Sequence, residues 1–112
     1  MHIRLLFASL LVLVSVSAVA DFETIERAYE VSLSDLTVPV AATGTLLFKE
    51  CSDCETRAIR MSDDTRFTVN GKQVELRIFR KAVFGVRDRR AIMVIVHHRL
   101  ESDTITSLNV TL

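Results

Sequence analysis

Apolar and polar residues alternate along most of the chain, in the period-two pattern that is typical of half-buried β-strands. The clearest case is Thr65–Val69, where the odd-numbered residues face one side and Arg66 and Thr68 the other. A continuous apolar run, Ala91–Val96, is bounded by charge on both sides and predicts a central strand that is covered on both faces. Further strands are predicted around residues 31–40, 44–49, 59–61, 72–76 and 105–112.

Several residues interrupt this alternation. Its phase slips between Leu33 and Leu36, which predicts a turn or bulge between them. Residues 62–64 (Ser-Asp-Asp) predict another turn. Pro39 has no N–H for a ladder hydrogen bond, so its strand is predicted to be an edge strand or to start there. Residues 70–71 (Asn-Gly) predict a type I′ hairpin, because both central residues of that turn need a positive φ.

The hydrophobic period becomes helical near residue 76. Leu76, Phe79 and Val83 lie at helical spacing and predict a short helix over Glu75–Ala82, followed by a loop that starts at Gly85. A helical turn and a disordered terminus are both open for the segment that contains Phe22, Ile25 and Tyr29.

These elements predict an all-β fold: a small OB-like barrel or β-sandwich of five to six strands with one short helix. The chain has 112 residues, with three Gly and one Pro, so it has no room for a flexible linker between domains. Its 14 basic residues equal its 14 acidic residues, which disfavours a strongly basic nucleic-acid binder. No G-x-S-x-G motif is present, and the sequence indicates neither catalytic residues nor a cofactor.

The first 20 residues have the pattern of a secretory signal peptide. Arg4 gives a positive n-region, Leu5–Val14 an apolar h-region, and Ala18–Ala20 the small residues before a cleavage site. The alternative is an uncleaved membrane anchor, but Leu5–Ala20 has 16 residues, whereas a stable span needs about 20. We therefore expect cleavage after Ala20, no membrane span afterwards, and a single periplasmic or secreted β-domain over residues 21–112.

Part of the mature chain resembles a known group of proteins. Gly44-Thr45-Leu46, a loop with two cysteines, Asp64–Phe67, Val69–Gly71 and the Val74-x-Leu76-x-x-Phe79 pattern are similar to small exported bacterial proteins of unknown function with an OB-like barrel layout. The resemblance implies a barrel of five or six strands and supplies no activity, although OB folds often bind oligonucleotides or oligosaccharides.

Two cysteines, Cys51 and Cys54, give the chain its sharpest chemical motif. In an oxidising compartment the first expectation is a structural disulfide between them. Thiol–disulfide exchange is a second possibility, since this spacing can favour a thiolate. The neighbouring carboxylates of Glu50, Asp53 and Glu55 disfavour that thiolate.

A metal site is the third possibility for the cysteines. Zinc or copper needs further ligands, and the weak candidates are His97 and His98 beside Cys51 and Cys54. Adjacent residues on a strand point to opposite faces, so at most one histidine could join the cysteines. A carboxylate such as Asp53 would have to complete the set.

A run of basic residues is the candidate binding surface. We call it the basic surface; it consists of Arg77, Arg80, Lys81, Arg87, Arg89 and Arg90. Arginine suits phosphate and carboxylate groups, so the expected partner is an anionic envelope component or a partner protein. Nucleic acid is disfavoured because no ladder of aromatic residues supports base stacking. The alternative is an ordinary solvated surface whose charge the acidic Glu50–Asp64 stretch offsets.

The sequence thus favours a non-catalytic binding or accessory module of the cell envelope. The alternative function is a thiol-active or metal-binding periplasmic protein that uses Cys51 and Cys54. The ligand and the oligomeric state do not follow from the sequence.

Overall fold

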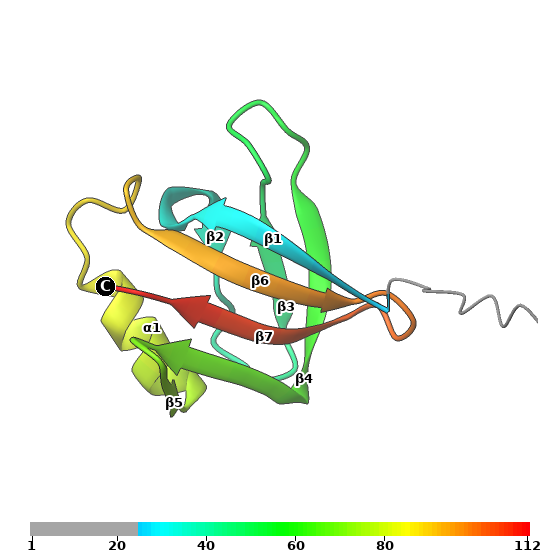
Figure 1. Cartoon of the computed structure of the whole chain (residues 1–112). Coiled ribbons are helices and arrows are strands. Elements are labelled where there is room, and N and C mark those ends of the chain that lie inside the picture. The colour runs from blue at the N-terminus through cyan, green and yellow to red at the C-terminus, as the bar shows by residue number, and fades with distance from the viewer. Residues whose placement is uncertain (1–24) are drawn as a thin grey trace, which may run out of the picture.

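The computed structural model describes residues 25–112, which form one sheet of seven strands and one α-helix (Figure 1). In chain order the elements are β1 (Glu26–Ser32), the 3-10 helix η1 (Leu33–Asp35), β2 (Leu36–Thr37), β3 (Thr45–Phe48), β4 (Arg57–Val69), β5 (Lys72–Val74), α1 (Leu76–Phe84), β6 (Met93–Arg99) and β7 (Thr104–Val110). The mainly β fold with one short helix, predicted from the sequence, is confirmed.

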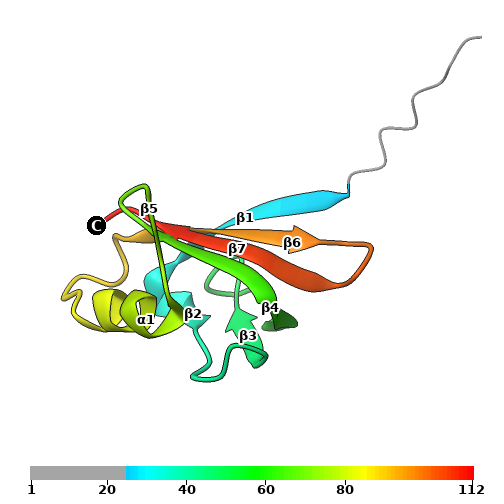
Figure 2. The ribbon, with the colours of Figure 1, turned by 90° about the horizontal axis from the view of Figure 1, so that it is seen from below.

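The sheet curls into a half-barrel whose two edge strands are consecutive in the chain (Figure 2). Its strand order is β1-β6-β7-β4-β3-β2, and β5 pairs with β4. All neighbours are antiparallel except β4 and β7. The three residues of η1 join the edges: the Leu33 amide donates to the Ile92 carbonyl at 2.8 Å, and the Lys49 amide donates to the Asp35 carbonyl at 3.1 Å.

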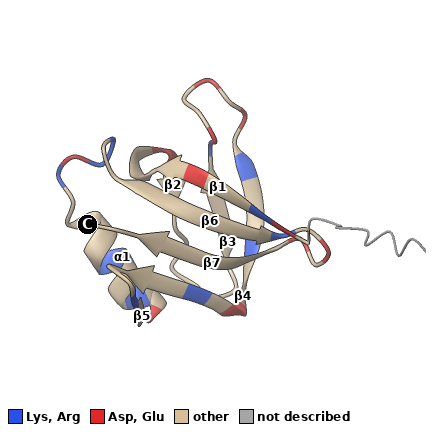
Figure 3. Cartoon of the chain, in the orientation of Figure 1, with Lys and Arg blue, Asp and Glu red and all other residues tan. Residues whose placement is uncertain are grey.

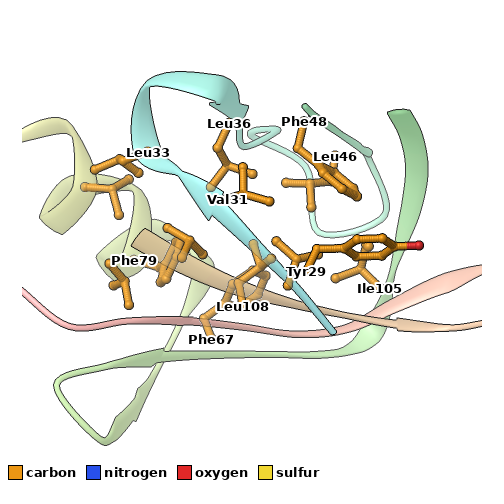
Figure 4. Packing of buried hydrophobic residues seen from close by; sticks show 14 of the residues in the cluster. Tyr29, Val31, Leu33, Leu36, Leu46, Phe48, Phe67, Phe79, Ile105 and Leu108 are labelled. Atoms are coloured by element: carbon orange, nitrogen blue, oxygen red, sulfur yellow. The ribbon is translucent and has the colours of Figure 1, made fainter. Parts of the chain in front are cut away.

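Apolar side chains from the concave face of the sheet and from α1 fill one core (Figure 4). The ring centroids of Tyr29 and Phe48 are 5.2 Å apart, and those of Phe67 and Phe79 are 5.5 Å apart. Burying one large aliphatic or aromatic side chain stabilises a fold by about 1.5–3 kcal/mol. The buried apolar residues are Tyr29, Val31, Leu33, Leu36, Leu46, Phe48, Ile59, Met61, Phe67, Phe79, Val83, Val94, Val96, Ile105, Leu108 and Val110.

β4 is a single strand of 13 residues with an irregularity in its middle. Its register against β7 shifts between Met61 and Arg66. The buried hydroxyl of Thr65 donates to the Ile105 carbonyl at 2.6 Å and accepts from the Ser62 amide at 2.9 Å. These bonds replace ladder hydrogen bonds at the bulge, so the predicted turn at residues 62–64 is wrong: the chain bends but stays in one strand.

Three other local predictions are confirmed. The change of phase in the apolar pattern between Leu33 and Leu36 is caused by the 3-10 helix η1. The hairpin between β4 and β5 has Asn70 at φ 51° and Gly71 at φ 79°. The predicted helix over 75–82 is present as α1, shifted toward the C-terminus by one or two residues.

The remaining differences concern strand ends and faces. The segment around Tyr29, for which the sequence left a helical turn and a disordered terminus open, is neither: residues from Glu26 onward form β1. β6 lies inside the sheet, but only one of its faces is buried, and Met93 on the other face is exposed. The predicted strand that included Pro39 ends earlier than expected, because Pro39 lies after β2. The last strand, β7, likewise ends before Leu112.

The predicted signal peptide over residues 1–20, with its cleavage site after Ala20, lies outside the described residues, as does Phe22. Within residues 25–112, no helix is long and apolar enough to cross a bilayer.

Candidate functional site

The six cations of the basic surface come from α1 and from the loop that follows it (Figure 3). Arg77, Arg80 and Lys81 lie on α1, and the other three lie on the loop before β6. Residues 77, 80, 81 and 84 are separated by three, four and seven positions, so they lie on neighbouring parts of one side of the helix. The structure therefore places three of the selected cations on one side of α1 and links the loop to the helix through Arg89.

α1 is amphipathic, and its two faces differ sharply in exposure. Phe79 and Val83 are 0% and 2% exposed and pack into the core. Ile78 and Phe84, in contrast, are 40% and 63% exposed. The outward face of the helix therefore carries two large apolar side chains next to the cations.

Phe84 lies between two guanidinium groups. The guanidinium carbons of Arg80 and Arg89 are 5.1 Å and 5.8 Å from the centroid of its ring. Such contacts are cation–π interactions, and each stabilises an exposed pair by about 0.5–1 kcal/mol. The two arginines hold the exposed ring in place at the C-terminal end of α1.

Arg89 is also fixed by the backbone. Its Nη1 donates to the Val83 carbonyl at 2.8 Å, and its Nη2 donates to the Leu33 carbonyl at 3.3 Å. The first bond satisfies a carbonyl at the end of α1, where a cation also complements the helix dipole. Arg89 thus connects α1 to the η1 corner, and part of its role is structural.

The other four cations are exposed: Arg77, Lys81, Arg87 and Arg90. None of them forms an ion pair with another residue in the part of the chain that the structure describes. Arg80 is half-buried, and its Nε atom is buried without a hydrogen-bond partner in the same residues. Arg80 and Arg89 thus form an ordered group with Phe84, and the other four cations are exposed in the same segment of the chain.

Cys51 and Cys54 lie in the loop between β3 and β4, which extends away from the sheet (Figure 1). Their sulfur atoms are within disulfide-bonding distance, and their Cα atoms are 5.0 Å apart. The Cys54 amide donates to the Cys51 carbonyl at 3.1 Å, which makes the loop a tight turn. Next to it, Arg57 Nε donates to Glu50 Oε2 at 3.1 Å. The expected pairing of the two cysteines is therefore present in the structure.

The two histidines lie on opposite faces of β6. His97 is on the outer face, with Nδ1 3.1 Å from Glu26 Oε1. His98 is 6% exposed on the inner face, with Nε2 2.7 Å from Asp103 Oδ1. No group of three or more His, Cys, Asp or Glu side chains within residues 25–112 is arranged to hold a metal ion. The structure does not bring the weak metal candidates together.

A series of contacting polar side chains, with Tyr29 and His98 buried at its middle, was not predicted from the sequence. The Tyr29 hydroxyl lies 3.5 Å from His98 Nδ1 and accepts a hydrogen bond of 3.4 Å from Arg57. Through Glu50 and Asp103 this series joins the cysteine loop to the turn between β6 and β7. Tyr29 and His98 are both buried, so the series supports the packing of β1 against β4 and β6.

The sequence analysis also missed a polar groove of about 900 Å³ at the bulge of β4. Arg66 and Arg99 line it together with the carboxylates of Glu26, Asp63 and Asp64. Its charges are mixed, and no aromatic side chain is among its lining residues, all of which are described. It lacks both the net charge for an anion and the aromatic platform that commonly stacks against bases.

Phe84 lies beside the basic surface and was not predicted from the sequence to belong to the site. It lies seven residues after Arg77, so a helical projection places it on the basic side rather than beside Phe79. Comparisons of the chain with family models, with curated proteins and with solved structures found no match. The candidate site is an exposed cationic surface with an aromatic ring that two of its arginines contact.

Proposed function

We propose that the protein is an exported, non-catalytic binding module that binds an anionic component of the cell envelope through the basic surface. One observation supports this most strongly: the guanidinium groups of Arg80 and Arg89 contact the exposed Phe84 ring, in a segment that carries four further exposed cations. Guanidinium groups suit phosphate and carboxylate oxygens, and an ordered site loses less entropy when it binds.

The concentration of charge supports a binding role over an ordinary solvated surface. Residues 75–90 contain six cations against two carboxylates, Glu75 and Asp88, although the whole chain is balanced. The acidic stretch at Glu50–Asp64 forms no ion pair with the basic surface within residues 25–112. Its carboxylates instead lie near Arg57 and at the groove. An uncompensated positive patch attracts anionic partners.

The proposal includes export. The signal-peptide pattern of residues 1–20 supports it, and so does a cysteine pair at bonding distance, because disulfides persist in oxidising compartments. An intact mass of protein from the exported fraction tests this part. We expect loss of residues 1–20 and two hydrogens fewer than the reduced chain. Full-length protein with free thiols in the cytosol would contradict export.

The alternative, a thiol-active or metal-binding protein that uses Cys51 and Cys54, has less support. The pair lies in a loop rather than at a helix N-terminus, and three carboxylates flank it in the sequence, which disfavours a thiolate. Selective alkylation of Cys51 at mildly acidic pH, after reduction, would favour this alternative.

The binding proposal is tested by co-sedimentation of the exported protein with an envelope fraction at low ionic strength. The test variant carries Arg87→Glu and Arg90→Glu, because both side chains are exposed and Arg89 supports the fold. The control carries Arg27→Glu and Arg60→Glu on β1 and β4, which changes the net charge equally.

We expect the test variant to lose most of the bound fraction, while the control binds like the wild type. Equal loss in both variants would assign the effect to net charge, and unchanged binding in the test variant would exclude the basic surface. Equal melting temperatures for all three proteins ensure that the comparison concerns folded molecules.

A further inference from the structure

The basic surface contains apolar area that recognition of a soluble anion does not require. Phe84 is 63% exposed and Ile78 is 40% exposed, and both lie away from the core-facing side of α1. Neither side chain belongs to the core, which α1 contacts through Phe79 and Val83. A partner that covers this face has to match apolar and cationic groups at the same time.

The order of these groups along α1 is that of an interfacial helix. Lys81 lies one turn after Ile78, and Phe84 follows one turn after Arg80 and Lys81. Long cationic side chains can keep their charge at the level of phosphate groups while apolar neighbours enter the layer below. The loop that follows α1 adds the exposed cations Arg87 and Arg90.

The contacts of Phe84 favour the same partner. The two guanidinium groups beside its ring carry positive charge next to an apolar group, and Arg89 is held by two backbone carbonyls. The ring therefore projects from a cationic rim that needs little rearrangement on binding. A polyphosphate would bind the cations but would leave the ring in water.

We propose that the partner is an anionic phospholipid surface. α1 would lie on the headgroups, with Phe84 and Ile78 in the interfacial layer and the exposed cations on lipid phosphates. This inference rests on the proposed function and names its ligand. Each cation near an anionic surface strengthens binding by a factor of about five, so four cations and one aromatic ring suffice for reversible attachment.

Tryptophan fluorescence tests this inference directly, because the chain contains no tryptophan. Phe84→Trp places a single reporter at the centre of the basic surface. Val40→Trp is the matched control: Val40 is apolar and 75% exposed, in the loop after β2. Each protein is mixed with vesicles of phosphatidylglycerol and phosphatidylcholine in equal parts, with pure phosphatidylcholine vesicles, or with soluble polyphosphate.

With the anionic vesicles we expect emission at shorter wavelength from the reporter at position 84 and no shift from the reporter at position 40. Pure phosphatidylcholine should produce no shift. Phe84→Ser should weaken sedimentation with anionic vesicles about tenfold, since the interfacial contribution of one ring is lost. Phe84→Leu should restore most of the binding.

Other outcomes separate this inference from the proposed function. If the protein binds polyphosphate and the envelope fraction but not vesicles, the inference of a lipid partner is wrong, and the proposed binding of an anionic component still holds. No binding to vesicles, polyphosphate or envelope would overturn both. Equal shifts at positions 40 and 84, or equal binding to both kinds of vesicle, would contradict specific attachment through the basic surface.

Discussion

Arg89 donates a hydrogen bond of 2.8 Å to the Val83 carbonyl at the end of α1, while its guanidinium carbon lies 5.8 Å from the centroid of the Phe84 ring. One side chain therefore bonds the last turn of the helix and contacts the exposed Phe84 ring. A residue that looked like one more surface cation in the sequence connects the fold to the candidate site.

Arg89→Ala should destabilise the protein by about 1–2 kcal/mol, because two carbonyls lose a charged donor at a half-buried position. Arg90→Ala is the control: its side chain is exposed, and we expect a change below about 0.5 kcal/mol. Urea unfolding followed by circular dichroism measures both. Equal effects of the two substitutions would contradict the structural role of Arg89.

The two phenylalanines of α1 should respond in opposite ways to truncation. Phe79→Ala removes a ring that is fully buried, so we expect a loss of about 3–5 kcal/mol in the free energy of unfolding. Phe84→Ala removes a mostly exposed ring with two cation–π contacts and should cost about 1–2 kcal/mol. Thermal or urea unfolding distinguishes them. A large loss at position 84 would place that ring in the core and weaken its assignment to a binding surface.

Thr65 should be required for the bulge in β4. Thr65→Val keeps the shape of the side chain but leaves the Ser62 amide and the Ile105 carbonyl without their buried partner, at a cost of about 1–3 kcal/mol. Thr68→Val, on the same strand with a half-buried side chain, is the matched control and should change little. If the two variants unfold at the same urea concentration, the hydroxyl does not specify the bulge.

The disulfide should make a small contribution to stability. It closes a loop between residues only three apart, and the loop-entropy relation gives about 2 kcal/mol for so short a loop. Replacing both cysteines by serine should lower the melting temperature and leave binding to the envelope fraction unchanged. A double variant that melts like the wild type but no longer binds would assign the pair to function instead of structure.

Much of the fold could be predicted from local patterns. The hairpin at Asn70-Gly71 and the helix at Leu76 follow from turn chemistry and apolar spacing, which involve only neighbouring residues. The bulge at Ser62–Thr65 could not be predicted in this way, because Thr65 acts through Ile105, forty residues later. Ser-Asp-Asp is as typical of a turn as of a bulge, and the hydrogen bond from Thr65 to the Ile105 carbonyl decides between the two structures.

The candidate site was predicted in part. Its six cations are visible as a run in the sequence, but the different role of Arg89 depends on carbonyls that only the folded chain brings near. Phe84 was missed because an aromatic residue near a helical apolar stripe is usually assigned to the core. The prediction that both faces of β6 are covered was wrong for a similar reason. Ile95 and Met93 continue the apolar run in the sequence although they face outward.

The most direct test of the binding surface is a map of backbone amide resonances during titration with a soluble short-chain phosphatidylglycerol. We predict that the largest shifts fall within residues 77–90, together with the side-chain Nε–H signals of Arg77, Arg87 and Arg90. Shifts concentrated at the groove, around Asp63, Asp64 and Arg99, or no shifts at all, would contradict it.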